Sequence, residues 1–240
     1  MALLHKAVLT PSKLELLQGW VPAQPWGGGG ALEQVGAFRF DDPAGEVGIE
    51  TLLVRAGDGP VLHVPLTYRS APLEGAGAGL IGTMEHSLLG ERWVYDGAAD
   101  PVYASVLATV VLNGGSHAEQ HWVIDGETVE KPLDTFAEGT GGAAELGATA
   151  PVPVEPVVLD AVTVESGPES SLVRGRARSG GELLIEVVRR VAGEGSVSAE
   201  DAASAARAEA ATAVSGESAL LVGRWPGEPA PRLLASATRA

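Results

Sequence analysis

The sequence predicts an α+β fold in which antiparallel sheet outweighs helix. Three strand-like runs, "LEQVGAFRFD", "VGIETLLVRA" and "VLHVPLTYRS", are separated by the turn signals "DPAG" and "GDGP". A helix pattern precedes them, and further strand-like runs begin near Val157, after a segment rich in Gly, Ala and Pro. Apolar residues make up 45% of the 240-residue chain, which is enough for a packed core.

The first elements are expected to be a strand in "LLHKAVLT" and a helix in "TPSKLELLQGW". Thr10 can cap this helix with Pro11 at its first position, and Leu14, Leu17 and Trp20 fall on one face. The following "VPAQPWGGGG" must end the helix. The three strand-like runs then predict an antiparallel meander packed on it.

The middle of the chain is harder to assign. After Gly82, the residues "TMEHSLL" are interpreted as a short helix following a loop of small residues. The apolar run "DPVYASVLATVVL" fits either a helix leading into a strand or one long strand, and both stay open. "NGG" at 113–115 supplies turn residues, so "AEQHWVIDG" is expected to be the second arm of a hairpin.

Residues 137–156 combine Gly, Ala and repeated Pro, and we interpret them as a linker between a first unit, 1–136, and a second unit, 157–240. The second unit should hold strands in "VVLDAVTVES", "SLVRGRA" and "ELLIEVVRRV". Ser198 begins an Ala-rich helix signal, and "ALLVGRWPGEPAPRLLASA" predicts two final strands joined by a turn.

Composition limits the classes of partner. The chain carries 31 acidic and 16 basic side chains, so a polyanion would meet mostly like charge and we expect no nucleic-acid partner. No apolar run reaches the roughly 18 residues of a membrane span, and the start does not resemble a signal peptide, so we expect a cytoplasmic protein with no membrane contact. The absence of cysteine removes thiolate chemistry.

A glycine motif raises the question of nucleotide binding. Gly77, Gly79 and Gly82 spell G-x-G-x-x-G, and Asp96 and Asp100 follow where a dinucleotide-binding fold places its ribose-binding acid. That motif requires a buried strand ending at the first glycine and a full helix leaving from the last. Pro72 interrupts the approach and Gly90 comes soon after, so we expect no cofactor here.

Two groups of polar residues are candidates for a catalytic or a metal site. His117 and His121 would share a strand face with Glu119, but a third ligand is not evident, so an ordinary polar strand is preferred and no bound metal is expected. The neighbours Glu85, His86 and Ser87 point in different directions on a helix and predict no triad, so no catalytic residue is assigned.

Three aromatic residues, Trp93, Tyr95 and Tyr103, suggest a platform on which a sugar ring could stack. Scattered aromatic side chains more often belong to the core, because burying each one removes about 150 to 250 Å² from water. We therefore predict that these three are core residues.

One stretch resembles a known family. "PLTYRSAPL", "IGTMEHSLLGERWVYD" and "DPVY", with "VGAFRFDDPAGEVGIETLLVR" upstream and "LNGGSHAEQ" downstream, resemble the N-terminal cap domain of actinobacterial maltokinases, over roughly residues 1 to 130. The resemblance is greatest to stand-alone cap-like proteins. It implies a cystatin-like curved sheet wrapped on a helix, and a link to α-glucan, maltose and trehalose metabolism.

The same resemblance implies that residues 157–240 are similar to the start of a kinase N-lobe, with Glu186 at the position of the family's nucleotide lysine. A carboxylate there would repel a triphosphate. Neither an "HGD" nor a "DFE" motif occurs before Ala240. We therefore expect a non-catalytic protein with a degenerate kinase N-lobe-like unit, acting through a protein of the glucan or maltose pathway or through small-molecule sensing.

Two alternatives remain from other classes. The chain could be an enzyme of glucan metabolism, either a sugar-kinase relative or a branching enzyme, although a glycosidase barrel needs about 250 residues. It could also be a cystatin-like protease-binding module, because "EQVGAF" faintly resembles the Q-x-V-x-G loop of cystatins. Oligomeric state is not predicted.

Overall fold

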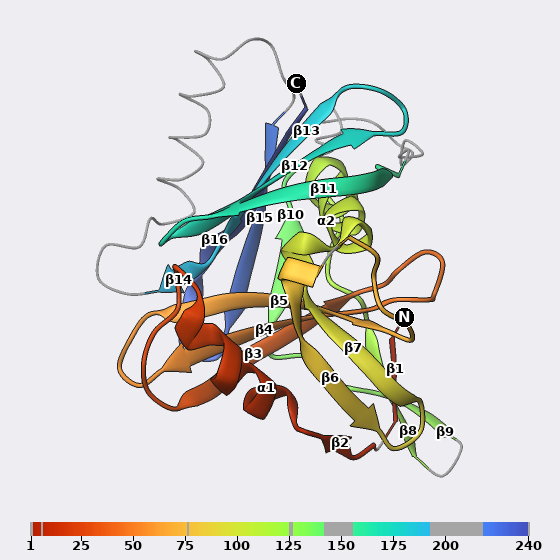
Figure 1. The fold of residues 1–240 in the computed structure, drawn as a ribbon, viewed down its shortest axis with the longest axis vertical. Coiled ribbons are helices and arrows are strands. Elements are labelled where there is room, and N and C mark those ends of the chain that lie inside the picture. Colours follow the sequence, from red (N-terminus) through yellow and green to blue (C-terminus); the bar gives the residue numbers. More distant parts are fainter. Residues whose placement is uncertain are drawn as a thin grey trace.

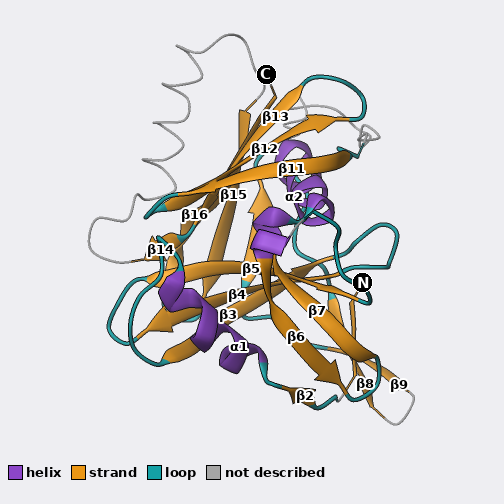
Figure 2. Ribbon diagram, in the orientation of Figure 1, coloured by secondary structure: helices purple, strands orange, loops and turns teal. Residues whose placement is uncertain are grey.

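The computed structural model describes residues 2–5, 7–75, 77–124, 127–141, 156–192 and 218–239, with only the backbone for 2–5. Within these residues the strands form three sheets around two α-helices, which confirms the α+β class (Figures 1 and 2). The helix expected from Ser198 lies outside the described residues. No helix in the described part of the chain is long and apolar enough to cross a membrane.

The largest sheet has seven strands and curls around the first helix. Its order is β2-β6-β7-β5-β4-β3, and β14 pairs with β5. The bounds are β2 Leu9–Thr10, β3 Leu32–Phe40, β4 Gly48–Ala56, β5 Val61–Arg69, β6 Leu80–His86, β7 Gly90–Asp96 and β14 Arg190–Ala192. Strands β3, β4 and β5 pair antiparallel in sequence order, so the predicted meander is confirmed.

The second sheet has six strands in the order β10-β15-β16-β13-β12-β11, all paired antiparallel. Its bounds are β10 Phe136–Gly139, β11 Leu159–Ser166, β12 Ser170–Ala177, β13 Glu182–Val188, β15 Ser218–Trp225 and β16 Glu228–Arg239. The strands predicted in the second unit are thus present. Strand β10 overlaps the start of the expected linker and yet belongs to this sheet, while residues 142–155 lie outside the description.

A small third sheet joins the N-terminus to the middle of the chain. Strand β1 (Ala2–His5) pairs parallel with β8 (Gln120–Ile124), which pairs antiparallel with β9 (Glu127–Glu130). The prediction that β8 forms a hairpin across "NGG" was wrong. Gly114 instead ends a helix in the left-handed conformation, φ 69°, that glycine adopts without strain.

Helix α1 (Lys13–Trp20) begins two residues later than the sequence predicted. Ser12 is the N-cap and forms a capping box with Glu15: Glu15 N–H donates to Ser12 Oγ at 3.3 Å, and Ser12 N–H donates to Glu15 Oε2 at 2.7 Å. Thr10 instead belongs to strand β2. Leu17 is fully buried, and Leu14 and Trp20 pack against the same cluster, as expected. The 3-10 turn η1 (Val21–Ala23) ends the helix.

The structure defines two further segments, one a helix and the other a strand. The apolar run after Asp100 is helix α2 (Pro101–Asn113), while the short helix expected after Gly82 was wrong, because that segment is strand β6. Strand β6 pairs with β7 through a turn at Gly90, whose φ is 71°. The hydrogen bonds between β6 and β7 make this segment a strand. The residue pattern of the segment alone does not predict that pairing. Two 3-10 turns flank the hairpin, η2 (Gly77–Gly79) and η3 (Gly97–Ala99).

The seven-stranded sheet has two faces with different coverings. The α1 face carries Leu52, Val64 and Val94 against helix α1. The opposite, α2 face carries Phe38, Ile49 and other side chains of one cluster that also contains residues of α2 and of the six-stranded sheet. This single cluster of buried residues crosses the boundary that the sequence suggested between two units. Their independence stays a prediction.

Candidate functional site

The glycine motif does not form a nucleotide cradle. Gly77 and Gly79 lie in η2 and Gly82 lies inside strand β6, so no helix leaves from the last glycine. Both acids that follow are engaged within the protein. Asp96 and Asp100 therefore have structural roles in place of the ribose contact that the motif suggested.

Asp96 ends strand β7 and pairs with a fully buried arginine. Arg189 Nη2 donates to Asp96 Oδ2 at 2.6 Å, and Arg189 Nε donates to Ser171 Oγ at 2.8 Å. The guanidinium carbon lies 4.7 Å from the centre of the Trp26 ring. This arginine, at the junction of β13 and β14, joins strands of both large sheets.

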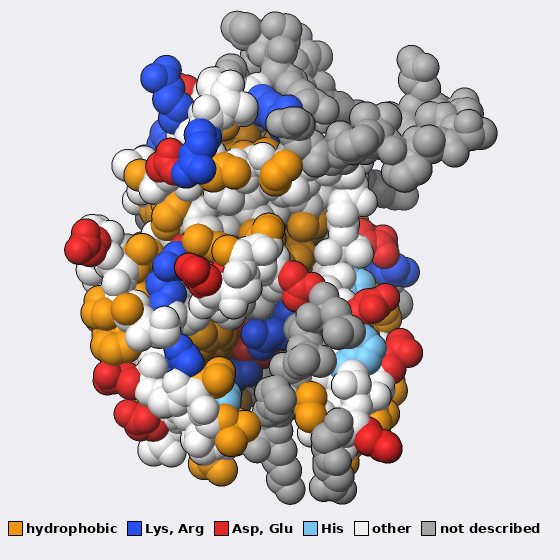
Figure 3. All heavy atoms as spheres, turned by 90° about the vertical axis from the view of Figure 1, so that its right-hand side faces the viewer, with side chains coloured by type: hydrophobic (Ala, Val, Ile, Leu, Met, Phe, Trp, Pro, Cys, Tyr) orange, Lys and Arg blue, Asp and Glu red, His pale blue; other side chains and the backbone are white. Residues whose placement is uncertain are grey.

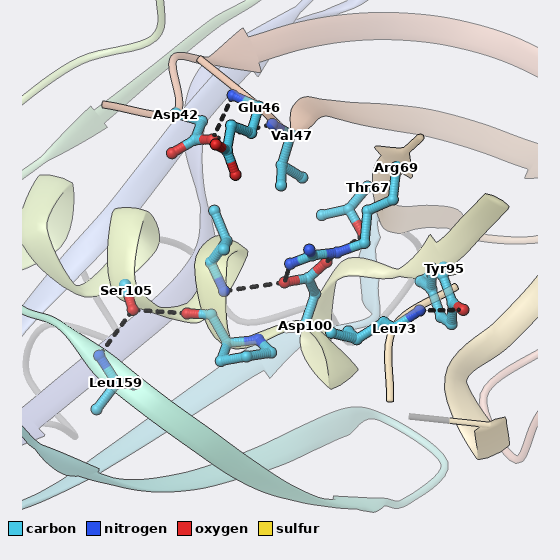
Figure 4. A network of polar contacts seen from close by, with 12 residues as sticks. Asp42, Glu46, Val47, Thr67, Arg69, Leu73, Tyr95, Asp100, Ser105 and Leu159 are labelled. Atoms are coloured by element: carbon cyan, nitrogen blue, oxygen red, sulfur yellow. Dashed lines mark hydrogen bonds and ion pairs between the residues drawn. The ribbon is translucent and has the colours of Figure 1, made fainter. Parts of the chain in front are cut away.

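Asp100 is also fully buried and accepts four hydrogen bonds (Figure 4). Arg69 donates to both of its oxygens at 2.7 Å, and Thr67 Oγ1 donates at 2.8 Å. The backbone N–H of Val102 donates at 2.9 Å, so Asp100 is also the N-cap of helix α2. One carboxylate thereby fixes the start of this helix to strand β5.

The histidine and acid groups singled out from the sequence are dispersed. His117 lies before strand β8, with its Nδ1 3.1 Å from the carbonyl oxygen of Ala137, while His121 lies on β8. His86 Nδ1 accepts the backbone N–H of Leu89, and Ser87 Oγ accepts that of Val8. In the described residues, no three His, Cys, Asp or Glu side chains gather as a metal site would require.

Of the three aromatic residues predicted to be in the core, Tyr95 and Tyr103 are core residues and Trp93 is not. Tyr95 and Tyr103 are 2% and 1% exposed, and Trp93 is half-buried. Tyr95 Oη accepts the backbone N–H of Leu73 at 2.9 Å (Figure 4). The rings of Tyr95 and Tyr103 therefore cannot offer a stacking face to a sugar from solvent.

Glu186 bears on the kinase-like hypothesis, and Gly36 bears on the cystatin-like one. Glu186 lies on β13 with its side chain exposed, opposite Leu172 and Ser236 in the ladder. Within "EQVGAF", Gly36 lies in strand β3, where a Cβ would come within 2.8 Å of Thr135 Oγ1 and 3.1 Å of Trp225 Cβ. That segment is therefore packed against the rest of the chain.

The best candidate site is a hollow on the α1 face, which we call the groove. Helix α1 covers only part of that face, and the uncovered part forms a concavity of about 1290 Å³ closed on one side by β8. Figure 3 shows this side of the molecule hollowed, with Lys and Arg side chains in its depth and hydrophobic side chains around it. Typical small-molecule pockets measure about 300–1,000 Å³, so the groove has room for a ligand of several rings.

The floor of the groove is an ion-paired network centred on Glu50 of strand β4. Lys13 Nζ lies 2.5 Å from Glu50 Oε2, and Arg39 Nη1 lies 3.4 Å from Oε1. Tyr68 Oη donates to Oε2 at 2.9 Å, and Lys13 Nζ lies 5.9 Å from the centre of the Tyr68 ring. Four residues from α1, β3, β4 and β5 are thus held in one arrangement before any ligand arrives.

The electrostatics of this network follow from its burial. Burial by itself would raise the pKa of the Glu50 carboxyl, but Lys13 and Arg39, with hydrogen bonds from Lys13 and Tyr68, hold that pKa below its usual value. Burial and the adjacent Glu50 charge raise the pKa of the Tyr68 hydroxyl. Glu50 is therefore a carboxylate and Tyr68 a neutral hydrogen-bond donor at neutral pH.

Strand β8 and the β6–β7 turn give the groove an apolar rim. Trp122 and Ile124, 39% and 52% exposed, and Leu89, 58% exposed, line its edge. Polar floor groups below an exposed aromatic ring make an arrangement suited to a sugar, which offers hydroxyls at its edge and C–H groups on its faces.

Sequence reasoning missed this site. Its residues are far apart in the chain, and none forms a spaced motif. The available signal was alternation: Glu50 and Tyr68 are polar residues in otherwise apolar strands, at positions that face the same side of the meander. Only the register between β4 and β5 reveals that they meet.

Comparison with known proteins finds a family model that covers part of the groove. Residues 20–100 match the family model of the maltokinase N-terminal cap domain, about a third of the chain. No curated protein matches the sequence. The matched range contains β3 to β7, and with them Arg39, Glu50 and Tyr68. Residues 20–100 are therefore similar to a maltokinase N-terminal cap domain, as the sequence resemblance predicted.

Proposed function

We propose that this protein is a non-catalytic, cap-like binding protein of maltose and trehalose metabolism, and that the groove on the α1 face binds a carbohydrate of that metabolism. The cap-domain match supports the metabolic link. The observation that carries the binding role is the groove itself, because it joins a pre-arranged polar floor to an exposed tryptophan. Small-molecule sensing is thus favoured over a purely protein-mediated role.

The positions of the acidic groups support a role without phosphoryl transfer. Asp96 and Asp100 are neutralised by Arg189 and Arg69, so neither is available as a base or a magnesium ligand. Glu186 is exposed on β13 and would place a negative charge where the kinase N-lobe resemblance requires a lysine. The proposal includes two further features of the chain: a kinase N-lobe-like unit in residues 157–240 and a cystatin-like topology of the cap.

The binding role is tested by thermal unfolding in the presence of maltose, trehalose, maltose 1-phosphate and ATP. A ligand of the native state raises Tm in proportion to its occupancy, so at least one saccharide should raise it in a concentration-dependent manner. Trp122→Ala should abolish the shift. Leu184→Ala removes an equally exposed apolar side chain from β13 and should leave the shift unchanged. If no saccharide changed Tm at millimolar concentration, the proposal would be wrong.

The non-catalytic part needs its own assay. Purified protein incubated with ATP, magnesium and maltose should release or transfer no phosphate above the level of Glu186→Ala. Turnover that the wild type shows and this variant lacks would overturn it. Appearance of new branch points in amylose would likewise favour the glucan-enzyme alternative.

A protein-binding role is the second candidate, because an apolar patch surrounds the groove. Leu88, Leu89, Trp122, Ile124 and Val129 are each at least 39% exposed, on the β6–β7 turn and on β8 and β9. Analytical ultracentrifugation with purified trehalose synthase or maltosyltransferase distinguishes the roles. A complex that Leu88→Ser disrupts would favour this second function.

A further inference from the structure

The groove has a different charge balance from the rest of the chain. Its lining contains four cationic side chains, Lys13, Arg39, Arg92 and Lys131, and four acidic ones, Asp41, Asp42, Glu46 and Glu50. The whole chain has 16 basic and 31 acidic side chains, so acids outnumber bases about two to one elsewhere. A protein that is strongly acidic overall thus concentrates a quarter of its lysine and arginine in one concavity.

On the floor, two cations share one carboxylate. Lys13 and Arg39 both contact Glu50, and Tyr68 supplies a third donor to the same group. The side chains of Lys13 and Arg39 are 29% and 18% exposed, so both still reach the groove. Lysine has three donor hydrogens and arginine five, far more than Glu50 can accept. The floor therefore carries surplus donors and a surplus of one positive charge.

Arg92 supplies a second, independent observation. It lies on β7 opposite Met84 in the ladder, and both line the groove. Its Nη2 donates to the carbonyl oxygen of Leu89 at 2.7 Å, which holds the guanidinium in place, whereas its Nε is buried and has no hydrogen-bond partner. Because Nε is buried, a ligand in the groove would meet the outer part of this guanidinium as a fixed positive charge.

Two of the four acids of the lining are engaged within the protein. Glu50 is already neutralised. Asp42 stabilises its own β3–β4 loop by accepting the backbone N–H group of Ala44 and those of Glu46 and Val47 (Figure 4). Three backbone donors stabilise that carboxylate where it stands. Glu50 and Asp42 therefore already accept hydrogen bonds from groups of the protein itself.

From this arrangement we propose that the groove is specific for a phosphorylated sugar, with Arg92, Arg39 and Lys13 contacting the phosphate and Trp122 packing against a sugar ring. This inference rests on the proposed function and names the ligand class of the same site. A phosphate monoester carries up to two negative charges and three acceptor oxygens, which matches the surplus of donors.

Isothermal titration tests the proposal with four probes: maltose 1-phosphate, glucose 1-phosphate, maltose and inorganic phosphate. We expect maltose 1-phosphate to bind at least tenfold more tightly than maltose or inorganic phosphate, with an affinity that weakens as salt is added. Arg92→Gln and Arg39→Gln should each lower that affinity about tenfold or more, because a hydrogen bond to a charged group is lost. Arg55→Gln is the matched control, since Arg55 is an exposed arginine of β4 outside the groove.

The possible results separate the two proposals. Equal affinity for maltose and maltose 1-phosphate would overturn phosphate recognition and leave carbohydrate binding intact. Inorganic phosphate binding as tightly as the sugar phosphates would overturn the sugar part of both. If none of the four bound, both would fall. Because a glutamine variant could lose stability, Arg92→Lys, which keeps the charge, should bind more tightly than Arg92→Gln at matched Tm, and equal affinities would contradict a role for the charge.

Discussion

Arg189 and Asp96, 93 residues apart in the sequence, form a buried ion pair in which Nη2 lies 2.6 Å from Oδ2. Arg189 is fully buried, and Asp96 is only 6% exposed. Breaking such a pair leaves one buried charge without a partner, which typically costs about 3–5 kcal/mol. We expect Arg189→Met and Asp96→Asn each to lower the free energy of unfolding by about that amount, measured by urea denaturation.

The double variant is the sharper test of the pair. Arg189→Met combined with Asp96→Asn removes both charges, so its loss should be clearly smaller than the sum of the two single losses. Simple additivity would mean that the two side chains stabilise the fold independently.

Asp100 combines an ion pair with a helix cap, and two substitutions separate these roles. Asp100→Asn keeps an oxygen that can accept the Val102 N–H but removes the charge that faces Arg69. Asp100→Ala removes both. Because loss of an N-cap costs about 1 kcal/mol, Asp100→Ala should be less stable than Asp100→Asn by roughly that amount in thermal or urea unfolding. Equal stabilities would rule out a capping role.

His63 makes stability depend on pH in the mildly acidic range. It is fully buried on β5, with Nδ1 2.9 Å from the carbonyl oxygen of Val188, and burial lowers its pKa from 6.5 to about 4. Between these two values the unfolded chain binds the proton and the folded chain does not. Stability should therefore be complete above pH 6.5 and fall as the pH drops towards 4, by about 3 kcal/mol in all at about 1.4 kcal/mol per pH unit.

The control for this pH effect is His63→Asn, in which the amide nitrogen can still donate to Val188 while the side chain no longer titrates. The slope of unfolding free energy against pH between 4 and 6.5 should be shallower in this variant. An unchanged slope would assign the effect to other groups.

The capping box at the start of α1 gives a direct comparison between two interpretations of the N-terminus. Ser12→Ala should lower the free energy of unfolding by about 1 kcal/mol, because it removes the acceptor of the Glu15 N–H. Thr10→Val should change it by less, since Thr10 lies in β2 and caps no helix. The reverse order would restore the cap that the sequence first suggested.

Elements that their own residues encode could be predicted from the sequence, whereas contacts between elements could not. Alternation predicted the β3–β5 meander and the strands of the second sheet other than β10, because a strand's own residues encode its two faces. Strand β6 was missed, since only its ladder with β7 distinguishes it from a short helix. The residues that fix Asp96 and Asp100, and the meeting of Lys13 with Glu50, depend on register and on sheet packing. No spacing within the sequence encodes those contacts.

Glu50 links stability, pH and the groove. Because Lys13 and Arg39 hold its pKa below the usual 4.5, the folded state favours the carboxylate. A group with a lowered folded pKa stabilises the fold above its unfolded pKa, and this contribution is lost as the pH falls through the folded value.

Glu50→Gln leaves Lys13 and Arg39 unneutralised, so at pH 7 it should cost about 2 kcal/mol. The gap between wild type and variant should then shrink as the pH drops below 4.5, when the wild-type carboxyl also becomes neutral. Tyr68→Phe is the matched control, because it removes one donor to Glu50 without changing the charge, so its gap at pH 7 should be smaller. A gap for Glu50→Gln that stayed constant from pH 7 to pH 3 would show that shape, and not charge, sets the contribution of Glu50.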